Sequence, residues 1–300
     1  MTPRTILQPT TSASRWALAM LLLGASAIAF APIFVRLSET GPISTAFWRL
    51  GLAVPVLWLG VAFSKQRGKS RPLTPSNLKF LAAAGFFFAG DLFFWHLALN
   101  YTSVANATLL PNMAPVFVTL GAWLLFRQHI TRTFLLGLLL AIFGALMLIG
   151  QSFSLSSANM LGDVLALCTA VFYASYILTV KHLRGNVSAL QLMAWSGTVC
   201  ALILLPAALL AGEQFLAASW VGWLALLALA LISHTGGQGL IAYSLAALPA
   251  TFSSVSLLWQ PVMAALLAWL ILGEALSFLQ ILGGGIVLAG IIVARRGSQI

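Results

Sequence analysis

Two side chains of opposite charge lie deep inside long apolar stretches of this sequence. Arg49 is the only cation well within such a stretch, and Asp91 is the only acid deep in one. A charge inside a membrane is costly unless it is paired, so each residue needs a partner. We favour a structural ion pair that orients two helices. The alternative is that Arg49 binds a substrate carboxylate, or that Asp91 binds a proton or an ammonium group.

Two histidines occupy similar stretches. His96 lies five positions after Asp91, whereas Trp95 lies four positions after it and shares its helix face more closely. His234 is followed four positions later by Gln238. Histidine has an unperturbed pKa of about 6.5, so either ring is a candidate proton carrier. We favour the alternative, a neutral hydrogen-bonding group in a polar cavity.

Neutral polar and aromatic side chains complete the candidate substrate site. Aromatic residues in membrane helices mostly pack or anchor the helix at the interface. Those beside kinks and polar neighbours, chiefly Trp259 and Tyr176, are the better candidates for contact with a flat or apolar substrate. Asn106 and Tyr173 are further candidates for the lining. The predicted substrate-binding residues are Arg49, Asp91, Trp95, His96, Asn112, Tyr176, His234, Gln238, Tyr243, Trp259 and Gln260.

The composition places these residues in a membrane protein. Of the 300 residues, 61% are apolar and only 7% are charged, against about 25% charged in an ordinary soluble domain. Ten apolar stretches of roughly 18 to 27 residues are each long enough to cross a hydrocarbon core of about 30 Å. Lipid offers the backbone no hydrogen-bond partners, so these stretches must be helices. The predicted spans are 16–36, 42–63, 78–100, 103–125, 132–150, 160–181, 188–212, 219–246, 250–272 and 277–294.

The chain also repeats itself about 146 positions apart, with Pro115 matching Pro261 and Gly137 matching Gly283. Each half has five spans, an odd number, so the second half must be inverted in the bilayer relative to the first. Inverted repeats are typical of transporters with a substrate site near the midplane. We therefore predict an all-α integral membrane protein with ten transmembrane helices as two inverted five-helix repeats around a central cavity.

The predicted cavity is built mainly from the first, third, fourth, sixth, eighth and ninth spans. The predicted organisation is a disordered cytoplasmic N-terminus at 1–14, a first repeat at 15–150, a periplasmic linker at 151–159 and a second repeat at 160–296.

Prolines and glycines inside the spans are the predicted gating elements. Pro115 and Pro261 each remove a backbone hydrogen bond, and their equivalent places in the two halves point to a central site. Gly236 and Gly237 have polar neighbours that favour a cavity over lipid. The alternative is that these residues only shape helix packing. A glycine-rich stretch in 277–294 is predicted to pack within the bundle, with a homodimer as the alternative.

The net charge of +10 follows the membrane topology rather than a nucleic-acid surface. With both termini in the cytoplasm, thirteen of the fifteen Lys and Arg residues fall on the cytoplasmic side, and Glu39, Glu213 and Glu274 fall outside. This is the positive-inside bias of multi-pass membrane proteins. A cleaved secretory signal is the less favoured interpretation, because the N-terminal apolar run continues to Val35.

Short motifs are similar to those of a known family. The second half has Pro261-Val262, then Leu272-Gly273-Glu274, then Gln280-Ile281-Leu282-Gly283. The first half matches at Pro115-Val116-Phe117 but has Phe126-Arg127-Gln128 in place of L-G-E, which suits a cytoplasmic corner. Over about residues 16–294 the chain resembles the EamA-type branch of the drug/metabolite transporter superfamily, and within it the YddG-like amino-acid and metabolite exporters. The resemblance implies outward movement of amino acids, aromatic ones among them, across a bacterial inner membrane.

These observations predict a transporter that exports small metabolites by alternating access, with neutral amino acids as the favoured substrates. Phosphorylated sugars would need a cluster of basic residues, which the spans lack. The alternatives are a multidrug or toxic-cation exporter and, more distantly, an intramembrane enzyme acting on lipid-linked substrates, for which the sequence has no nucleophile motif or metal-ligand spacing. We expect no cofactor, metal or nucleic-acid partner; the expected partners are a small-molecule substrate and membrane lipids.

Overall fold

The structure, a computed structural model, describes residues 11–64, 73–102, 104–149, 160–272 and 276–298. All regular secondary structure in these ranges is helical, and none of it is strand. Ten helical segments within them are long and apolar enough to cross a membrane, which confirms the predicted all-α membrane fold. Their bounds agree with the predicted spans to within a few residues.

Five of the ten spans are single helices and five are interrupted. The single helices are span 3, α5 (Pro75–Ala98); span 5, α8 (Arg132–Ile149); span 6, α9 (Met160–Leu183); span 7, α10 (Ala189–Leu210); and span 10, α15 (Phe278–Gly297). The interrupted spans are span 1, α1 (Thr11–Ile28) and α2 (Ala31–Leu37); span 2, α3 (Pro42–Gly51) and α4 (Ala53–Phe63); span 4, α6 (Val104–Leu109), η2 (Leu110–Met113) and α7 (Ala114–Phe126); span 8, α11 (Trp220–Ala228), η5 (Leu229–Gln238) and α12 (Gly239–Ser244); and span 9, α13 (Ala250–Ser256) and α14 (Trp259–Leu272).

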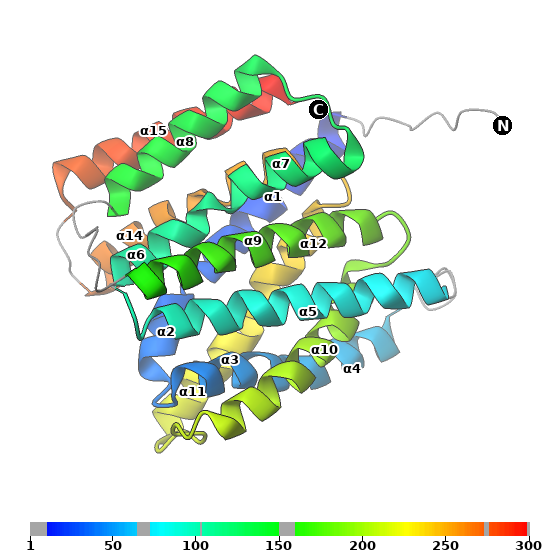
Figure 1. The fold of residues 1–300 in the computed structure, drawn as a ribbon, viewed down its shortest axis with the longest axis vertical. Coiled ribbons are helices and arrows are strands. Elements are labelled where there is room, and N and C mark those ends of the chain that lie inside the picture. The colour runs from blue at the N-terminus through cyan, green and yellow to red at the C-terminus, as the bar shows by residue number, and fades with distance from the viewer. Residues whose placement is uncertain (1–10, 65–72, 103, 150–159, 273–275, 299–300) are drawn as a thin grey trace.

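Spans 5 and 10 pack side by side through small residues, as Figure 1 shows for α8 and α15. A Cβ atom added to Gly137 would lie 2.7 Å from the carbonyl oxygen of Gly290, and one added to Gly144 would lie 2.7 Å from that of Gly283. Gly283 and Gly290 are the repeat equivalents of Gly137 and Gly144. The contact is therefore reciprocal, as a two-fold axis between inverted repeats requires.

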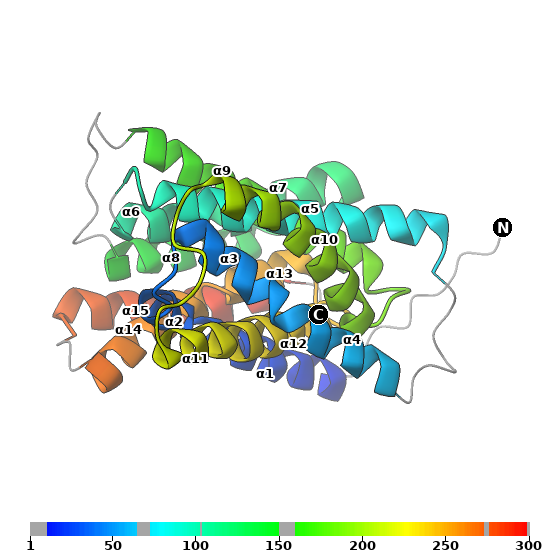
Figure 2. The ribbon, with the colours of Figure 1, turned by 90° about the horizontal axis from the view of Figure 1, so that it is seen from below.

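The remaining spans pack in matching ways in the two halves. Span 3 packs against span 6 as span 8 packs against span 1, and span 4 contacts span 6 as span 9 contacts span 1. Two groups of three spans result, one of spans 3, 4 and 6 and the other of spans 8, 9 and 1. Figure 2 shows α5, α7 and α9 on one side of the molecule and α1, α12 and α14 on the other. The predicted inverted five-helix repeats are confirmed.

The glycine stripe of span 10 faces α8 within the same chain. Gly283 and Gly290 are buried against this helix, as the favoured interpretation of 277–294 predicts. A Cβ atom on Gly285, by contrast, would meet nothing within 4 Å. A homodimer through this helix stays a prediction.

Helix α1 begins earlier than expected. Thr11 to Ser14 belong to α1, so this part of the N-terminus is helical rather than disordered. Residues 1–10 and the predicted linker 151–159 lie outside the described residues.

The two faces of the bundle are joined differently. The N-terminal end of α1 and the C-terminal end of α15 lie on one face, here called the terminal face (Figure 1). On the opposite face, two glutamates each bind a helix N-terminus of the other half. Glu39 accepts hydrogen bonds from the backbone N–H of Ser219, at 2.8 Å, and from its hydroxyl, at 2.7 Å. Glu213 accepts one from the backbone N–H of Ser44. A carboxylate at a helix N-terminus is stabilised by the free N–H groups there, so these two contacts tie α3 and α11 to the other repeat.

The close packing of α8 on α15 predicts that Gly137 tolerates no side chain. In Gly137→Ala the new Cβ would collide with the backbone of Ala294 and Gly290, and overpacking of this kind costs about 1–3 kcal/mol. We expect a lower melting temperature in thermal unfolding of the purified protein. Gly285→Ala is the matched control, because it has open space, and it should not lower the melting temperature. Equal melting temperatures for the two variants would contradict the packing.

The Glu39 contact predicts a loss of stability in acid. Hydrogen bonds from the Ser219 hydroxyl and backbone N–H hold the pKa of Glu39 below its usual value of 4.5. A carboxyl with a lowered pKa stabilises the fold above its unfolded pKa, and this contribution disappears as the pH falls through the folded pKa. Glu39→Gln should therefore melt below the wild type at neutral pH, and the gap should close below about pH 4.5. A gap that is unchanged down to pH 3 would contradict this role.

Candidate functional site

A cavity of about 190 Å³ lies between the two groups of three spans. Its wall comes from spans 1, 3, 4, 6, 8 and 9, the six that the sequence predicts, together with Arg49 from span 2. Equivalent positions of the two repeats line it together. These pairs are Thr108 with Ser254, Pro111 with Leu257, Asn112 with Leu258, Ala114 with Gln260, and Pro115 with Pro261.

The cavity sits where spans 4 and 9 are interrupted. Pro115 and Pro261 have no N–H to donate one turn back, and the helix loosens just before each of them, at Leu110–Met113 and at 257–258. Neighbouring groups instead donate hydrogen bonds to carbonyl oxygens that the interruptions leave free. Asn112 Nδ2 donates to the Thr108 carbonyl oxygen at 2.8 Å, and the Gln260 backbone N–H donates to that of Leu257 at 2.9 Å. Both predicted gating prolines thus line the cavity at a helix break.

Span 8 is interrupted in another way, by a ten-residue π-helix, η5. Its wider turn is held by bonds such as the one from Thr235 Oγ1 to the Ala230 carbonyl oxygen, at 2.9 Å. π-Helical segments are rare and occur mostly at functional sites. Gly237 in this segment touches span 1: its Cβ, if present, would lie 3.0 Å from the Gly24 carbonyl oxygen. Gly236, the other predicted gating glycine, has more room, with Leu231 O at 3.3 Å.

Arg49 and Asp91 both line the cavity, but they do not form the ion pair that the sequence favours. Arg49 is buried, its guanidinium lies over the Phe88 ring at 5.9 Å, and its Nε has no hydrogen-bond partner. Asp91 is half-buried, with its carboxylate on the cavity side of α5. Among the described residues neither side chain forms a hydrogen bond or a direct ion pair. The direct ion pair that the sequence favours is therefore not formed, although α3 and α5, which carry the two residues, pack against each other.

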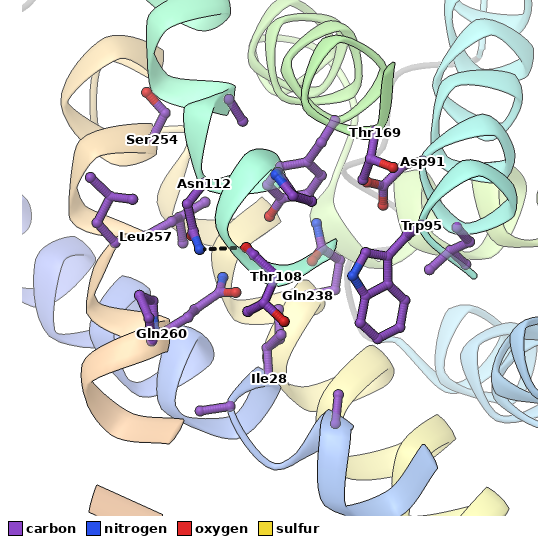
Figure 3. Close-up of a pocket in the computed structure, with 18 of the residues that line it drawn as sticks. Ile28, Asp91, Trp95, Thr108, Asn112, Thr169, Gln238, Ser254, Leu257 and Gln260 are labelled. Atoms are coloured by element: carbon purple, nitrogen blue, oxygen red, sulfur yellow. Dashed lines mark hydrogen bonds between the residues drawn. The ribbon is translucent and has the colours of Figure 1, made fainter. Parts of the chain in front are cut away.

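Four further predicted residues lie at the cavity: Trp95, Asn112, Gln238 and Gln260. Figure 3 shows Asp91, Thr169 and Trp95 along one side, Ser254, Leu257 and Gln260 along the other, and Gln238 between them. The Trp95 Nε1 donates to the Ala107 carbonyl oxygen at 3.1 Å, which fixes the ring against span 4. Gln238 is buried and its Nε2 has no partner.

The other predicted residues lie behind the cavity wall or away from it. His96 is buried, and its Nδ1 lies 2.7 Å from the Leu92 carbonyl oxygen. Tyr176 is buried, with its hydroxyl 3.7 Å from the Met193 sulfur. Trp259 Nε1 donates to Ser26 Oγ at 2.9 Å and so joins span 9 to span 1. Tyr243 is 56% exposed on α12, outside the cavity wall.

His234 lies beside the centre of the molecule. Its ring stacks on Phe88 with 5.3 Å between centroids, and neither ring nitrogen has a partner. Phe88 and His234 are repeat equivalents. Two equivalent residues can touch only close to the two-fold axis, so this stack marks the axis. Among the described residues no group of three or more His, Cys, Asp or Glu side chains is placed to hold a metal ion.

Sequence reasoning missed several lining residues. Thr169 and Ile177 lie one helical turn on either side of Tyr173, so the i, i+4 rule was a usable signal for both. Thr108 and Ser254 are polar residues at equivalent positions of the repeats, and this pairing was a second usable signal for cavity-lining residues. Pro32 and Pro111 also line the cavity. In the sequence, a proline inside a span indicates a kink but does not show that the residue faces a cavity.

Comparison with known proteins gives a consistent result. The sequence pattern of the EamA-like transporter family matches residues 15–150 and 160–296. The uncharacterized transporter YdfC of Bacillus subtilis is 26% identical over 279 residues, which cover 90% of this chain and 87% of YdfC. The pseudopaline exporter CntI of Pseudomonas aeruginosa is 26% identical and covers 84% of this chain and 86% of its own. A "probable terminal-alkyne amino-acid exporter" of Streptantibioticus cattleyicolor is 28% identical, over 94% of this chain and 93% of its own.

A solved crystal structure has the same fold. It superposes with a TM-score of 0.76 over 96% of this chain and 99% of its own, at 20% sequence identity. At this identity the likeness concerns the fold alone.

The isolated Asp91 carboxylate predicts an unusual response to neutralisation. Asp91→Asn removes a charge that has no partner among the described side chains, so the melting temperature of the purified protein should stay the same or rise. Loss of one partner from a buried ion pair would instead cost roughly 3–5 kcal/mol.

Asp163→Asn is the matched control. The Asp163 carboxylate accepts hydrogen bonds from Thr102 Oγ1 at 2.6 Å and from Asn106 Nδ2 at 2.8 Å, so this variant should melt lower. A similar drop for Asp91→Asn would show that Asp91 has a structural partner after all.

Proposed function

Since the chain belongs to the EamA-like transporter family, we propose that it exports small metabolites across a membrane by alternating access, with neutral amino acids, aromatic ones among them, as its substrates. The observation that carries this proposal is the cavity between the two halves. It combines one unpaired cation and one unpaired anion with a largely apolar wall, at the helix breaks of both repeats. Transport sites in inverted-repeat carriers have this position.

The size of the cavity supports a substrate of amino-acid dimensions. Its volume of about 190 Å³ is somewhat larger than the engineered cavity of about 150 Å³ that holds benzene. Two relatives are named as exporters, one of pseudopaline and one of a terminal-alkyne amino acid. These names support an exporter rather than an enzyme, and the second supports an amino-acid substrate.

The charge distribution supports an orientation. The Lys and Arg residues are concentrated at the terminal face, as at Arg132, Lys181, Arg184, Arg295 and Arg296. By the positive-inside rule this face is cytoplasmic. We therefore place both termini in the cytoplasm and the protein in the bacterial inner membrane.

Hydrogen bonds at the terminal face support a state that is closed on this side. Lys181 Nζ donates to the carbonyl oxygens of Leu245 and Leu248, at 3.0 and 2.8 Å, and Arg184 Nε donates to that of Ala242 at 2.8 Å. These bonds join the end of span 6 to the last helix of span 8 and to the turn that leads into span 9. In an alternating-access cycle they must break for the cavity to reach the cytoplasm.

The gating residues then have a mechanical role. Pro115 and Pro261 keep spans 4 and 9 loosened at the level of the cavity, and Gly237 lets span 8 slide closely along span 1. Each break allows one half of a span to tilt while the other half stays packed. Rocking of spans 3, 4 and 6 against spans 8, 9 and 1 would expose the cavity to each side in turn.

One observation keeps a second candidate function in view. The free Asp91 carboxylate suits a lipophilic cation as well as an amino group, which is the chemistry of a multidrug or toxic-cation exporter. Arg49 in the same cavity opposes a cationic ligand, so we favour the amino acids.

Counterflow in proteoliposomes tests the proposal. Vesicles loaded with unlabelled amino acids should take up labelled phenylalanine, leucine and threonine saturably, and labelled lysine far less, because lysine brings a second positive charge near Arg49. Protein-free vesicles are the control, and two internal pH values test whether protons take part. Flux of a lipophilic cation with no amino-acid flux would overturn the proposal in favour of the drug exporter.

A further inference from the structure

We propose that Arg49 and Asp91 act as a divided charge pair that selects ligands carrying both a carboxylate and an ammonium group. Arg49, assisted by Gln238, binds the carboxylate, and Asp91 binds the ammonium group. The inference rests on the proposed function, because it assigns specificity within the same cavity. The inference goes further than the proposed function because it requires the ligand to be a zwitterion without net charge.

The Arg49 side of the cavity offers hydrogen-bond donors that suit an anion. Its guanidinium has five N–H donors and no acceptor, yet it makes no hydrogen bond to any described residue, and Nε is buried without a partner. Gln238, from the neighbouring π-helix, lines the same cavity; its buried amide interacts with Tyr173 and Tyr176, but its Nε2 makes no hydrogen bond of good geometry. Buried donors are almost always hydrogen-bonded in native proteins. A carboxylate offers the acceptors that both side chains lack.

The Asp91 side is a matching acceptor site. Its carboxylate lines the cavity from α5, and no donor of the described residues is bonded to it. An ionised carboxylate only accepts hydrogen bonds, and an ammonium group only donates them. Thr169, beside Asp91 in Figure 3, offers a further oxygen, although its hydroxyl hydrogen is directed to the Leu165 carbonyl oxygen at 3.2 Å. An ammonium group can therefore satisfy this side without any rearrangement of the wall.

The two charges must be satisfied together. A ligand with only an amine would neutralise Asp91 and bring a positive charge close to the unpaired Arg49. A ligand with only a carboxylate would leave Asp91 unpaired and add a second negative charge. Either case leaves a charge without a partner in a poorly solvated site, which is costly. A zwitterion satisfies both at once and adds no net charge to the cavity.

The rest of the wall explains why the selection does not depend on which apolar side chain the ligand carries. Ile28, Leu92, Leu257 and Pro261 present apolar surface to the cavity. The hydrophobic effect depends on the apolar area that is buried and has no preferred direction. Such a surface therefore discriminates only weakly among apolar side chains of the ligand. Specificity for the zwitterionic head group with tolerance for varied side chains follows.

The test compares three ligands that share one ring and differ in charge: phenylalanine, phenethylamine and 3-phenylpropanoate. Binding to the purified full-length chain is measured by calorimetry. The wild type should bind phenylalanine at least about tenfold more tightly than either analogue, the factor expected for one unmade charged hydrogen bond. Asp91→Asn should lose about this factor for phenylalanine and phenethylamine but keep its affinity for 3-phenylpropanoate. Arg49→Gln should do the reverse.

Two results would overturn the inference: an analogue that binds the wild type as tightly as phenylalanine, or variants that weaken all three ligands equally. The wild-type series decides the question even if Arg49→Gln does not fold, and Arg49→Lys then keeps the charge while removing Nε. The proposed function fails separately, by absence of amino-acid counterflow in the wild type. Counterflow of phenylalanine with equal competition by both analogues would leave the exporter in place and remove the charge selection.

Discussion

Every backbone N–H and C=O group inside a membrane must find a partner in the protein, and this constraint decides where the cavity of this protein lies. A helix can be interrupted at membrane depth only where the freed groups are bonded locally or face a cavity. Spans 1, 4, 8 and 9 are all interrupted, and the cavity is lined by residues at or next to each interruption. Short local bonds, such as Asn112 to the Thr108 carbonyl, make the breaks tolerable. The cavity and the helix interruptions are thus one structural feature, which we propose as both the substrate site and the hinges.

The packing of the helices follows the two-fold axis between the repeats, whereas the charged residues of the cavity do not. Gly137 and Gly144 meet Gly290 and Gly283 reciprocally, and Phe88 stacks on its own equivalent, His234. Asp91 corresponds to Gly237, which packs closely on span 1 and has no side chain to offer. Packing and hinges can be duplicated because both halves need them. A single site on the axis has room for one set of charges, so the charged residues occur in one half only.

The sequence predicts the fold far better than the site, for a physical reason. Span lengths and the repeat depend on hydropathy and spacing, which are properties of each segment alone, and both agree with the structure. Whether two residues on different spans meet depends on how each helix is rotated and on what lies between them. Arg49 and Asp91 line the same cavity, yet no direct ion pair joins them. Tyr243 and Gln238 are five positions apart in one span, but one is exposed and the other lines the cavity.

In the proposed transport cycle, the same asymmetry between the halves affects the balance between the two states. At the terminal face, Lys181 and Arg184 hold three carbonyl oxygens of the segment that ends span 8 and leads into span 9. Their repeat equivalents at the opposite face are Val35 and Ser38, and of these only Ser38 has a polar side chain, bonded within its own helix end to the Val35 carbonyl oxygen. Hydrogen bonds from charged donors contribute more than those from a hydroxyl. The opposite face is held instead by the Glu39 and Glu213 contacts. In the proposed cycle, exchanging the roles of the two halves would therefore not produce two states of equal free energy. In that proposed cycle, the substrate supplies part of the free energy that breaks the bonds at the terminal face, which a ligand can do only by binding the other state more tightly.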